Sequence, residues 1–319
     1  MIIFIFLISL ILTIIIEWKL IPRLNAKAAQ PIYEEGPSWH ISKKGTPTMG
    51  GIAFLISITA SLFIFCLVSG GNKILLSSVL ISMLFSIGNA AIGIIDDMTK
   101  LRRKTNAGLK SYEKLILQTL IAIIFLMSRA YFLGDDTVLR FSFFEFDIGA
   151  MYYLLALIII LGTVNCANLT DGIDGLASSI AVTIGLSFLI IGISGSNAIK
   201  PLSAALIGGA LGFLFFNINP AKVFMGDTGS LFLGGLVCSL AFEFGNPTVV
   251  LFLGGVYAIE GLSVILQVTY FKLTKKRLFR MSPIHHHLEK CGLRENTICI
   301  IAVCLTTLLT IIAALLFRL

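Results

Sequence analysis

The sequence predicts an all-α integral membrane protein with about ten transmembrane helices. Of its 319 residues, 57% are hydrophobic and only 13% are charged, whereas soluble globular proteins have about 45–50% apolar and about 25% charged residues. Apolar windows of roughly 20 residues, long enough to cross the hydrocarbon core of a bilayer, recur along the whole chain. We therefore expect a single polytopic membrane domain over residues 1–319, with no soluble domain between the spans.

The predicted spans follow one another with short polar connections. They cover approximately residues 2–19, 50–69, 74–95, 115–133, 149–167, 176–195, 200–217, 229–245, 248–271 and 297–317. The first window lacks the basic start and the small-residue cleavage site of a signal peptide, so we interpret it as a span. The eighth window is short and rich in glycine, and its ends are the least sharply defined.

Lysine and arginine predict the orientation in the membrane. The stretches at the exits of the odd-numbered windows carry 19 of the 24 basic residues, and the other five are Lys73, Arg129, Arg140, Lys200 and Arg318. Basic residues remain on the cytoplasmic side. Both termini are therefore predicted to be extracytoplasmic. Topology accounts for most of the net charge of +7, which needs no nucleic acid partner.

Five aspartates gather in three short motifs at the predicted cytoplasmic face. "DDMTK" contains Asp96 and Asp97, "NLTDGIDGL" contains Asp171 and Asp174, and "FMGDTGS" contains Asp227. Clustered carboxylates repel one another unless a cation lies between them. Because every ligand would be oxygen, a hard divalent cation such as Mg²⁺ fits best. A single aspartate is more commonly a helix cap, but five at one membrane face favour a cation site.

The residues around these aspartates are typical of phosphate binding. Gly226 and the hydroxyl of Ser230 flank Asp227 just before a predicted helix, where main-chain N–H groups can converge on an anion. The first cytoplasmic loop contributes Lys43 in "HISKKGTPTMGG". Lys100 and Lys114 follow the paired aspartates and are suited to phosphate or carboxylate partners.

Three of the four histidines, His285, His286 and His287, lie in "SPIHHHLEKCG" in the last long loop. Consecutive residues of a helix point in different directions, so they do not predict a three-ligand metal site. Imidazoles can donate to phosphate oxygens or move protons, and a surface position without function is the alternative. Glu260 and Gln267 lie inside the ninth window, where polar groups either face a cavity or join two helices.

These motifs, in this order, resemble those of the phospho-N-acetylmuramoyl-pentapeptide transferases, a branch of the polyprenyl-phosphate N-acetylhexosamine-1-phosphate transferases. The resemblance extends from about residue 20 to the last window. The aspartate motifs are shared by the superfamily, whereas "GTPTMGG" and the triple histidine of "PIHHHLE" are typical of this branch. Leu288 stands where phenylalanine is expected, which is a conservative difference.

The resemblance implies a reaction and a setting. Phospho-MurNAc-pentapeptide would pass from UDP-MurNAc-pentapeptide to undecaprenyl phosphate with Mg²⁺ as cofactor, releasing UMP and forming lipid I. The enzyme would be a homodimer of ten-helix subunits in the bacterial inner membrane, surrounded by membrane lipid.

The motifs and the resemblance together give three sets of candidate site residues. The catalytic candidates are Asp96, Asp97, Asp227, Lys100, Lys114, His285, His286 and His287. The substrate-binding candidates are Lys43, Thr48, Asn168, Asp171, Asp174, Asn217, Phe224, Gly226, Ser230 and Gln267. The metal ligands are Asp227 and Asp97.

Two mechanisms and two other functions compete at this point. The acceptor phosphate could attack directly, with Asp96 aligning it or removing a residual proton, or an aspartate could form a covalent phospho-enzyme. A sister enzyme would move GlcNAc-1-phosphate to the same lipid. A secondary transporter would place its acids near the midplane and often shows inverted repeats, whereas these acids lie at one face and no repeat is visible.

Overall fold

The computed structural model describes residues 1–25, 43, 45–70, 72–103, 108–192 and 196–317. Helices account for most of this part of the chain. They are α1 (Ile2–Asn25), α2 (Gly51–Val68), α3 (Lys73–Arg103), α4 (Ser111–Leu133), α5 (Met151–Thr170), α6 (Leu176–Ile191), α7 (Ile199–Asn217), α8 (Gly226–Glu243), α9 (Val250–Leu253), α10 (Gly255–Thr274), α11 (Ile284–Lys290) and α12 (Glu295–Leu316), with a 3₁₀ turn η3 (Pro247–Val249) before α9. Strands β1 (Val138–Arg140) and β2 (Glu145–Asp147) form an antiparallel hairpin with Leu139 opposite Phe146.

The all-α membrane fold is confirmed. Within the described residues, eight helices are long and apolar enough to cross a membrane, namely α1–α5, α7, α10 and α12. The sixth and eighth predicted windows also contain helices. α6 has only 16 residues, and α8 carries Asp227 and Glu243 near its ends. Because every residue of α8 from Thr228 to Glu243 is buried, this helix is enclosed by protein and needs no lipid-facing surface.

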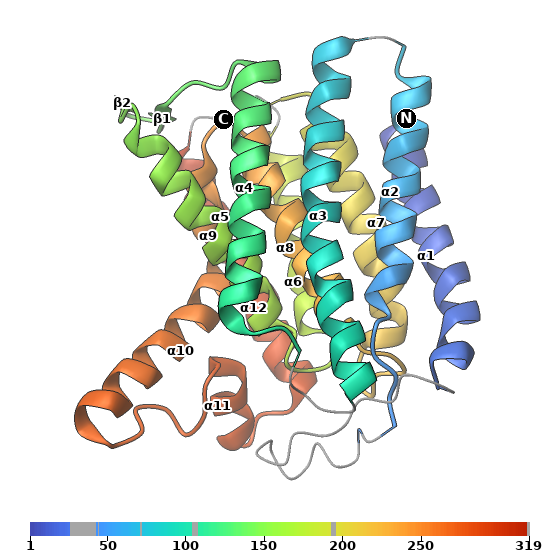
Figure 1. Cartoon of the computed structure of the whole chain (residues 1–319), viewed down its shortest axis with the longest axis vertical. Coiled ribbons are helices and arrows are strands. Elements are labelled where there is room, and N and C mark those ends of the chain that lie inside the picture. Colours follow the sequence, from blue (N-terminus) through green and yellow to red (C-terminus); the bar gives the residue numbers. More distant parts are fainter. Residues whose placement is uncertain (26–42, 44, 71, 104–107, 193–195, 318–319) are drawn as a thin grey trace.

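The two ends of the bundle differ in chemistry. Figure 1 shows that α1 begins and α12 ends at the same end, together with the β1–β2 hairpin, while α10 and α11 lie at the opposite end. The C-terminal end of α3 and the N-terminal end of α8 also lie at the α11 end. The aspartate motifs therefore share one end of the molecule, as the sequence predicts.

Two helices differ from the predicted windows. α3 continues through Asp96 and Asp97 to Arg103, so the paired aspartates belong to a helix and not to a loop. Their charges are paired at this point, which lets the helix continue beyond its apolar run. The ninth window is interrupted at Gly254, after which α10 leaves the bundle as a protruding helix. Its outward residues, such as Leu262 and Ile265, are exposed for contact with lipid.

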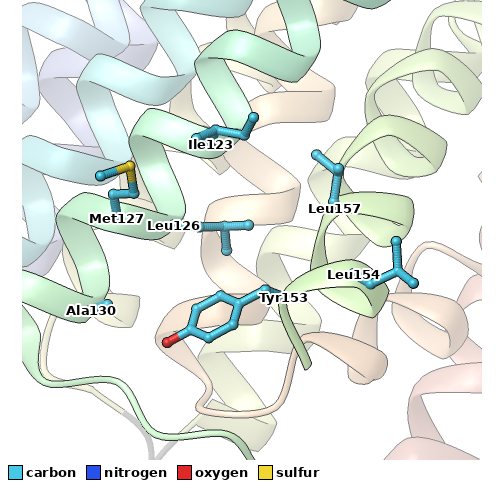
Figure 2. Close-up of a pocket in the computed structure, with 7 residues that line it drawn as sticks. All are labelled: Ile123, Leu126, Met127, Ala130, Tyr153, Leu154 and Leu157. Carbon is cyan, nitrogen blue, oxygen red and sulfur yellow. The ribbon is translucent and has the colours of Figure 1, made fainter. Parts of the chain in front are cut away.

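An apolar recess of about 440 Å³ lies between α4 and α5 (Figure 2). Its lining residues are Ile123, Leu126, Met127, Ala130, Tyr153, Leu154 and Leu157. They come from the second half of α4 and the first half of α5, toward the hairpin end. No lining residue is charged, so the polar chemistry of the protein must take place elsewhere.

Candidate active site

Asp96, Asp97 and Asp227 form a compact group where α3 crosses the first turn of α8. One carboxylate oxygen from each residue lies within 4.8 Å of the other two. The helices approach closely because Gly93 has no side chain, and a Cβ there would lie 2.3 Å from the main-chain oxygen of Asp227. Asp96 and Asp97 are buried. The packing of α3 on α8 therefore forces the acids together.

Two lysines balance part of this charge. Lys100 Nζ lies 2.7 Å from Asp96 Oδ2 and 2.9 Å from Asp227 Oδ1. Lys114, in the first turn of α4, pairs with Asp227, and its Nζ lies 3.4 Å from Asp96 Oδ1. The N–H of Leu109 also donates to Asp96 Oδ1 over 2.7 Å. Among the described residues, three carboxylates thus face two ammonium groups, which leaves a net charge of −1 in this cluster.

Asp97 caps α8 from a different helix. Its carboxylate accepts from the N–H of Asp227 (3.1 Å) and from both the N–H (2.9 Å) and the hydroxyl (2.7 Å) of Thr228. The first N–H groups of a helix have no partner within the helix and carry partial positive charge. Gly226 has φ +72°, and a Cβ there would lie 2.7 Å from Asp97 Oδ2. A protein carboxylate therefore occupies the place where the sequence predicts a bound phosphate.

The donor set of this cluster fits a hard divalent cation. All three groups offer carboxylate oxygens, which such cations prefer. Asp97 Oδ2 accepts two hydrogen bonds and Oδ1 accepts one from the described residues, so Oδ1 retains a lone pair for a metal. Asp96 belongs to the same group, whereas the sequence predicts only Asp97 and Asp227 as ligands.

A second polar group joins three distant segments. Lys43 Nζ lies 2.7 Å from both Asp174 Oδ1 and Glu295 Oε1. Asp174 Oδ2 accepts from the side-chain amide of Asn219 (3.0 Å) and the N–H of Ala221 (2.9 Å). Asp174 is nearly inaccessible, and its two oxygens are engaged by the protein. Lys43 retains 17% of its side-chain surface.

Asp171 is electrostatically coupled to both groups. Burial, and then the negative charges of Asp227 and Asp97, raise the pKa of the Asp171 carboxyl well above its usual range, and Asp174 adds to the effect. Asp171 follows the last residue of α5, and its N–H donates to the main-chain oxygen of Asn168. The turn after α5 thus carries a carboxyl group whose charged form is disfavoured by its surroundings.

The three histidines of α11 have different surroundings. His285 is buried, and its Nδ1 lies 3.0 Å from Glu260 Oε2 on α10. The other side of its ring lies against Gly172, where a Cβ would be 2.2 Å from Nε2. His286 Nδ1 pairs with Glu289 Oε2 at 2.6 Å. The contact with Gly172 places His285 against the Asp171–Asp174 turn.

Gln267 and His287 hold the chain between α10 and α11. Gln267 Oε1 accepts from the N–H groups of Leu278 (3.1 Å) and Phe279 (2.8 Å). His287 Nδ1 accepts from the N–H of Arg280 at 3.2 Å. Within the described residues, the hydrogen bonds of Gln267 Oε1 are therefore to the main chain of the segment between α10 and α11.

Asn168 and Ser230 connect the end of α5 to the start of α8. Asn168 Nδ2 donates to Ser230 Oγ over 2.7 Å, and the Ser230 hydroxyl donates to the main-chain oxygen of Gly226 over 3.1 Å. The side chain of Asn217 is buried and makes two hydrogen bonds. Its Oδ1 accepts from the N–H of Gly175, and its Nδ2 donates to the main-chain oxygen of Val223. These amides fix the turns on which the aspartates lie.

Thr48 and Phe224 lie where the first loop meets the loop before α8. The N–H of Phe224 donates to Pro47, and the N–H of Gly50 donates back to Phe224, over 2.8 and 2.9 Å. This pairing places Thr48 Oγ1 3.0 Å from the position of a Cβ on Gly226. Of the "HISKKGTPTMGG" motif, residues 40–42 and 44 lie outside the described residues.

Two glutamates of this region were not among the predicted site residues. Glu295, the first residue of α12, contacts Lys43 and accepts the N–H of Asp174 over 2.8 Å. It lies in no motif, and its partners are more than 100 residues away in sequence. Glu260 is a polar residue within an apolar window, and this pattern alone distinguishes it in the sequence.

The sequence of this chain is similar to that of a known family of proteins. Residues 79–245 match the model of glycosyl transferase family 4, and residues 43–55 match a signature of the phospho-N-acetylmuramoyl-pentapeptide-transferases. A protein of that name from Heliobacterium modesticaldum is 44% identical over 88% of this chain and 86% of its own. Those of Clostridium botulinum and Clostridioides difficile are 41% and 38% identical, over 92% and 95% of this chain and 89% and 94% of theirs. The chain therefore belongs to glycosyl transferase family 4 and, within it, to the phospho-N-acetylmuramoyl-pentapeptide transferase family.

Proposed function

We propose that this protein transfers phospho-MurNAc-pentapeptide from UDP-MurNAc-pentapeptide to undecaprenyl phosphate, releasing UMP and forming lipid I, the first lipid-linked peptidoglycan precursor. The cluster of Asp96, Asp97 and Asp227 with Lys100 and Lys114 carries this proposal. It combines acids suited to a cation with ammonium groups suited to phosphates, at one end of a membrane bundle where a soluble donor meets a lipid acceptor. The protein is accordingly a multi-pass transferase of the bacterial inner membrane.

The signature at residues 43–55 decides between the two sugar substrates. This signature is that of the phospho-N-acetylmuramoyl-pentapeptide-transferases. The relatives reported above have that name, and the matches cover most of their length. This favours UDP-MurNAc-pentapeptide over UDP-GlcNAc as the donor.

Mg²⁺ is the cofactor that we propose, held by Asp227 and Asp97 with Asp96 beside them. The support is the all-oxygen donor set and its unbalanced negative charge. When bound, such an ion neutralises phosphate charge and polarises a phosphoryl oxygen.

The chain's own residues then align two phosphates for a single displacement. An oxygen of undecaprenyl phosphate forms a bond to the sugar-bound phosphorus, the bond from that phosphorus to the bridging oxygen breaks, and UMP leaves with the electron pair. The second pKa of a phosphate monoester is about 6, so the acceptor is largely dianionic at neutral pH and needs little deprotonation. Asp96, fixed by Lys100 and the N–H of Leu109, serves to align the acceptor.

The lysines act on the leaving group. Lys100 and Lys114 would offset the charge that develops on UMP as the pyrophosphate bond breaks. The rival covalent mechanism needs a carboxylate free to attack phosphorus. The three candidates are already engaged by ammonium or N–H groups, which lowers their nucleophilicity and supports direct displacement.

The acceptor chain would lie along α4 and α5. The apolar recess begins at Ile123, nine residues after Lys114, or about 14 Å along the helix axis. A polyprenyl phosphate with its head at Lys114 would reach this recess without leaving the protein surface. The absence of charge in the lining supports a hydrocarbon occupant.

Two further proposals concern the assembly. The whole chain, residues 1–319, would form one membrane domain, because α1 packs on α7 and α6 packs on α12, joining early and late segments. A homodimer follows from the family resemblance alone. Measurement of mass in detergent by light scattering tests it, and a monomer at all concentrations would refute it.

The proposed reaction is tested with purified protein, Mg²⁺ and undecaprenyl phosphate. UDP-MurNAc-pentapeptide that is radiolabelled in its sugar or peptide should yield a labelled lipid and unlabelled UMP. UDP-GlcNAc that is radiolabelled in its sugar should yield no labelled lipid. Replacing Mg²⁺ with EDTA should abolish the transfer. Lipid labelling from UDP-GlcNAc alone would establish the sister activity instead.

A further inference from the structure

Glu295 holds together two residues that approach it from different parts of the chain. Its carboxylate accepts hydrogen bonds from the Lys43 ammonium group, and both of its oxygens lie within 2.8 Å of Lys43 Nζ. It also accepts a hydrogen bond from the main-chain N–H of Asp174 over 2.8 Å. As the first residue of α12, it places its negative charge at the positive end of the helix dipole. The carboxylate is therefore stabilised at this point even apart from Lys43.

α12 fixes Asp174 twice. Glu295 takes the N–H of Asp174, and the thiol of Cys299, one turn later, donates to its main-chain oxygen over 3.4 Å. The side chain of Asp174 then bonds Lys43, Asn219 and the N–H of Ala221. Both carboxylate oxygens of Asp174 are therefore engaged by the protein and its side chain is only 2% exposed, so Asp174 supports the residues around it.

Lys43 is the member of this group that a ligand can reach. Its side chain is 17% exposed, against 2% for Asp174 and 11% for Glu295. Burial alone would lower the pKa of Lys43, but the hydrogen bonds and charges of Asp174 and Glu295 outweigh it and raise that pKa. One carboxylate would suffice to anchor a structural lysine. A second one keeps the ammonium charged and in a fixed position.

We propose that Glu295 is a positioning residue for the donor substrate, acting through Lys43. The proposal rests on the transferase function proposed above. All three residues of this group lie at or beyond the ends of transmembrane helices, on the aqueous side, where a soluble UDP-linked donor approaches. Lys43 precedes α2, Asp174 lies between α5 and α6, and Glu295 begins α12. The acceptor meets the protein along α4 and α5 instead. Loss of Glu295 should therefore weaken use of the donor and leave use of the acceptor unchanged.

The test compares Glu295→Gln, Lys43→Met and the double variant. Glutamine retains an oxygen for the N–H of Asp174 but removes the charge that holds Lys43. We expect the KM for UDP-MurNAc-pentapeptide to rise about tenfold in Glu295→Gln, as for loss of one charge-assisted hydrogen bond. The kcat and the KM for undecaprenyl phosphate should remain within about twofold of the parent. Glu295→Asp, which retains the charge, should recover part of the loss.

The double variant separates positioning from a general structural effect. If Glu295 acts through Lys43, adding Glu295→Gln to Lys43→Met should not raise the donor KM further. Asp136→Asn is the matched control, because it breaks an exposed ion pair with Arg140 at the hairpin end. Its donor KM should equal that of the parent.

Three results would overturn the inference: an unchanged donor KM in Glu295→Gln, an equal rise in the KM of both substrates, or full additivity with Lys43→Met. Failure of the parent protein to turn over UDP-MurNAc-pentapeptide at all would instead refute the proposed function. The melting temperature of each variant, measured in detergent, shows whether a kinetic change reflects unfolding.

Discussion

Asp97 and Asp227 lie side by side, yet the protein holds them by different means. Asp97 accepts from the N–H groups and the hydroxyl at the start of α8. Asp227 is held by the ammonium groups of Lys100 and Lys114. The first arrangement caps a helix, and the second balances charge. The same substitution should therefore have different effects on folding at the two positions.

Asp227→Asn should inactivate the enzyme without unfolding it. The amide retains the shape of the turn but is a poor ligand for a hard cation, so transfer should fall by about 100-fold or more. The remaining two carboxylates match the two lysines in charge, and the melting temperature should stay close to that of the parent. The radiolabel assay and a thermal melt in detergent measure the two effects. Excess Mg²⁺ should restore only a little activity.

Asp97→Asn should lose both activity and stability. Relief of charge repulsion alone would raise the melting temperature. The amide oxygen can keep the two bonds from Thr228, but the NH₂ group that replaces the other oxygen cannot accept the N–H of Asp227. Losing one hydrogen bond costs about 1 kcal/mol, and losing the negative charge of an acceptor at a helix N-terminus adds to that cost. We expect a lower melting temperature than that of Asp227→Asn. If the two variants melt alike, Asp97 does not cap α8.

Asp171 predicts a pH dependence of stability. Its pKa is raised in the folded protein, so the folded state binds a proton that the unfolded state has released, and stability falls as pH rises between the two pKa values. Asp171→Asn removes the titrating group, so its stability should not fall in this way as pH rises. In EDTA, the variant should melt at a higher temperature than the parent at neutral pH and at the same temperature near pH 4. A difference that does not change with pH would contradict this.

At the scale of elements, the sequence predicts the helices better than their ends. The long apolar runs reveal the positions of ten predicted spans, because a helix needs about 20 apolar residues to cross a bilayer. The continuation of α3 past Asp96 depends on Lys100 and on the start of α8, which no local pattern reveals. The break at Gly254 is likewise hidden inside a continuous apolar run. Local hydropathy therefore finds the spans and misses what interrupts or extends them.

The crossing of α3 and α8 can be tested at Gly93. A Cβ there would lie 2.3 Å from the Asp227 main-chain oxygen and 2.6 Å from Thr228 Cα. Because both atoms belong to the backbone, Gly93→Ala must push the helices apart and separate Asp97 from its donors. We expect a lower melting temperature and reduced transfer. Gly162→Ala in α5 is the control, since nothing lies within 4 Å of its Cβ position, and it should melt at or above the parent's temperature.

At the scale of the whole molecule, the site is assembled from segments that the sequence keeps far apart. The aspartate motifs were predicted to lie at one face, and they do so because odd-numbered spans end there (Figure 1). The sequence could not show which residues touch. Lys43, Asp174 and Glu295 meet from positions more than 100 residues apart. Such contacts depend on how the helices pack, and no local pattern in a single sequence reveals them.

The orientation of this assembly is the last prediction, and two cysteines measure it. Cys291 follows α11 at the active-site end and is exposed, so in intact cells a membrane-impermeant thiol reagent should not label it if that end is cytoplasmic. Phe143→Cys provides the matched control, because Phe143 is 86% exposed in the connection between β1 and β2 at the opposite end. It should react quickly in the same cells, and Cys291 should react only after the membrane is permeabilised. The reverse pattern would place the acids outside, where a cytoplasmic UDP-linked donor cannot reach them, and would refute the orientation and the proposed reaction together.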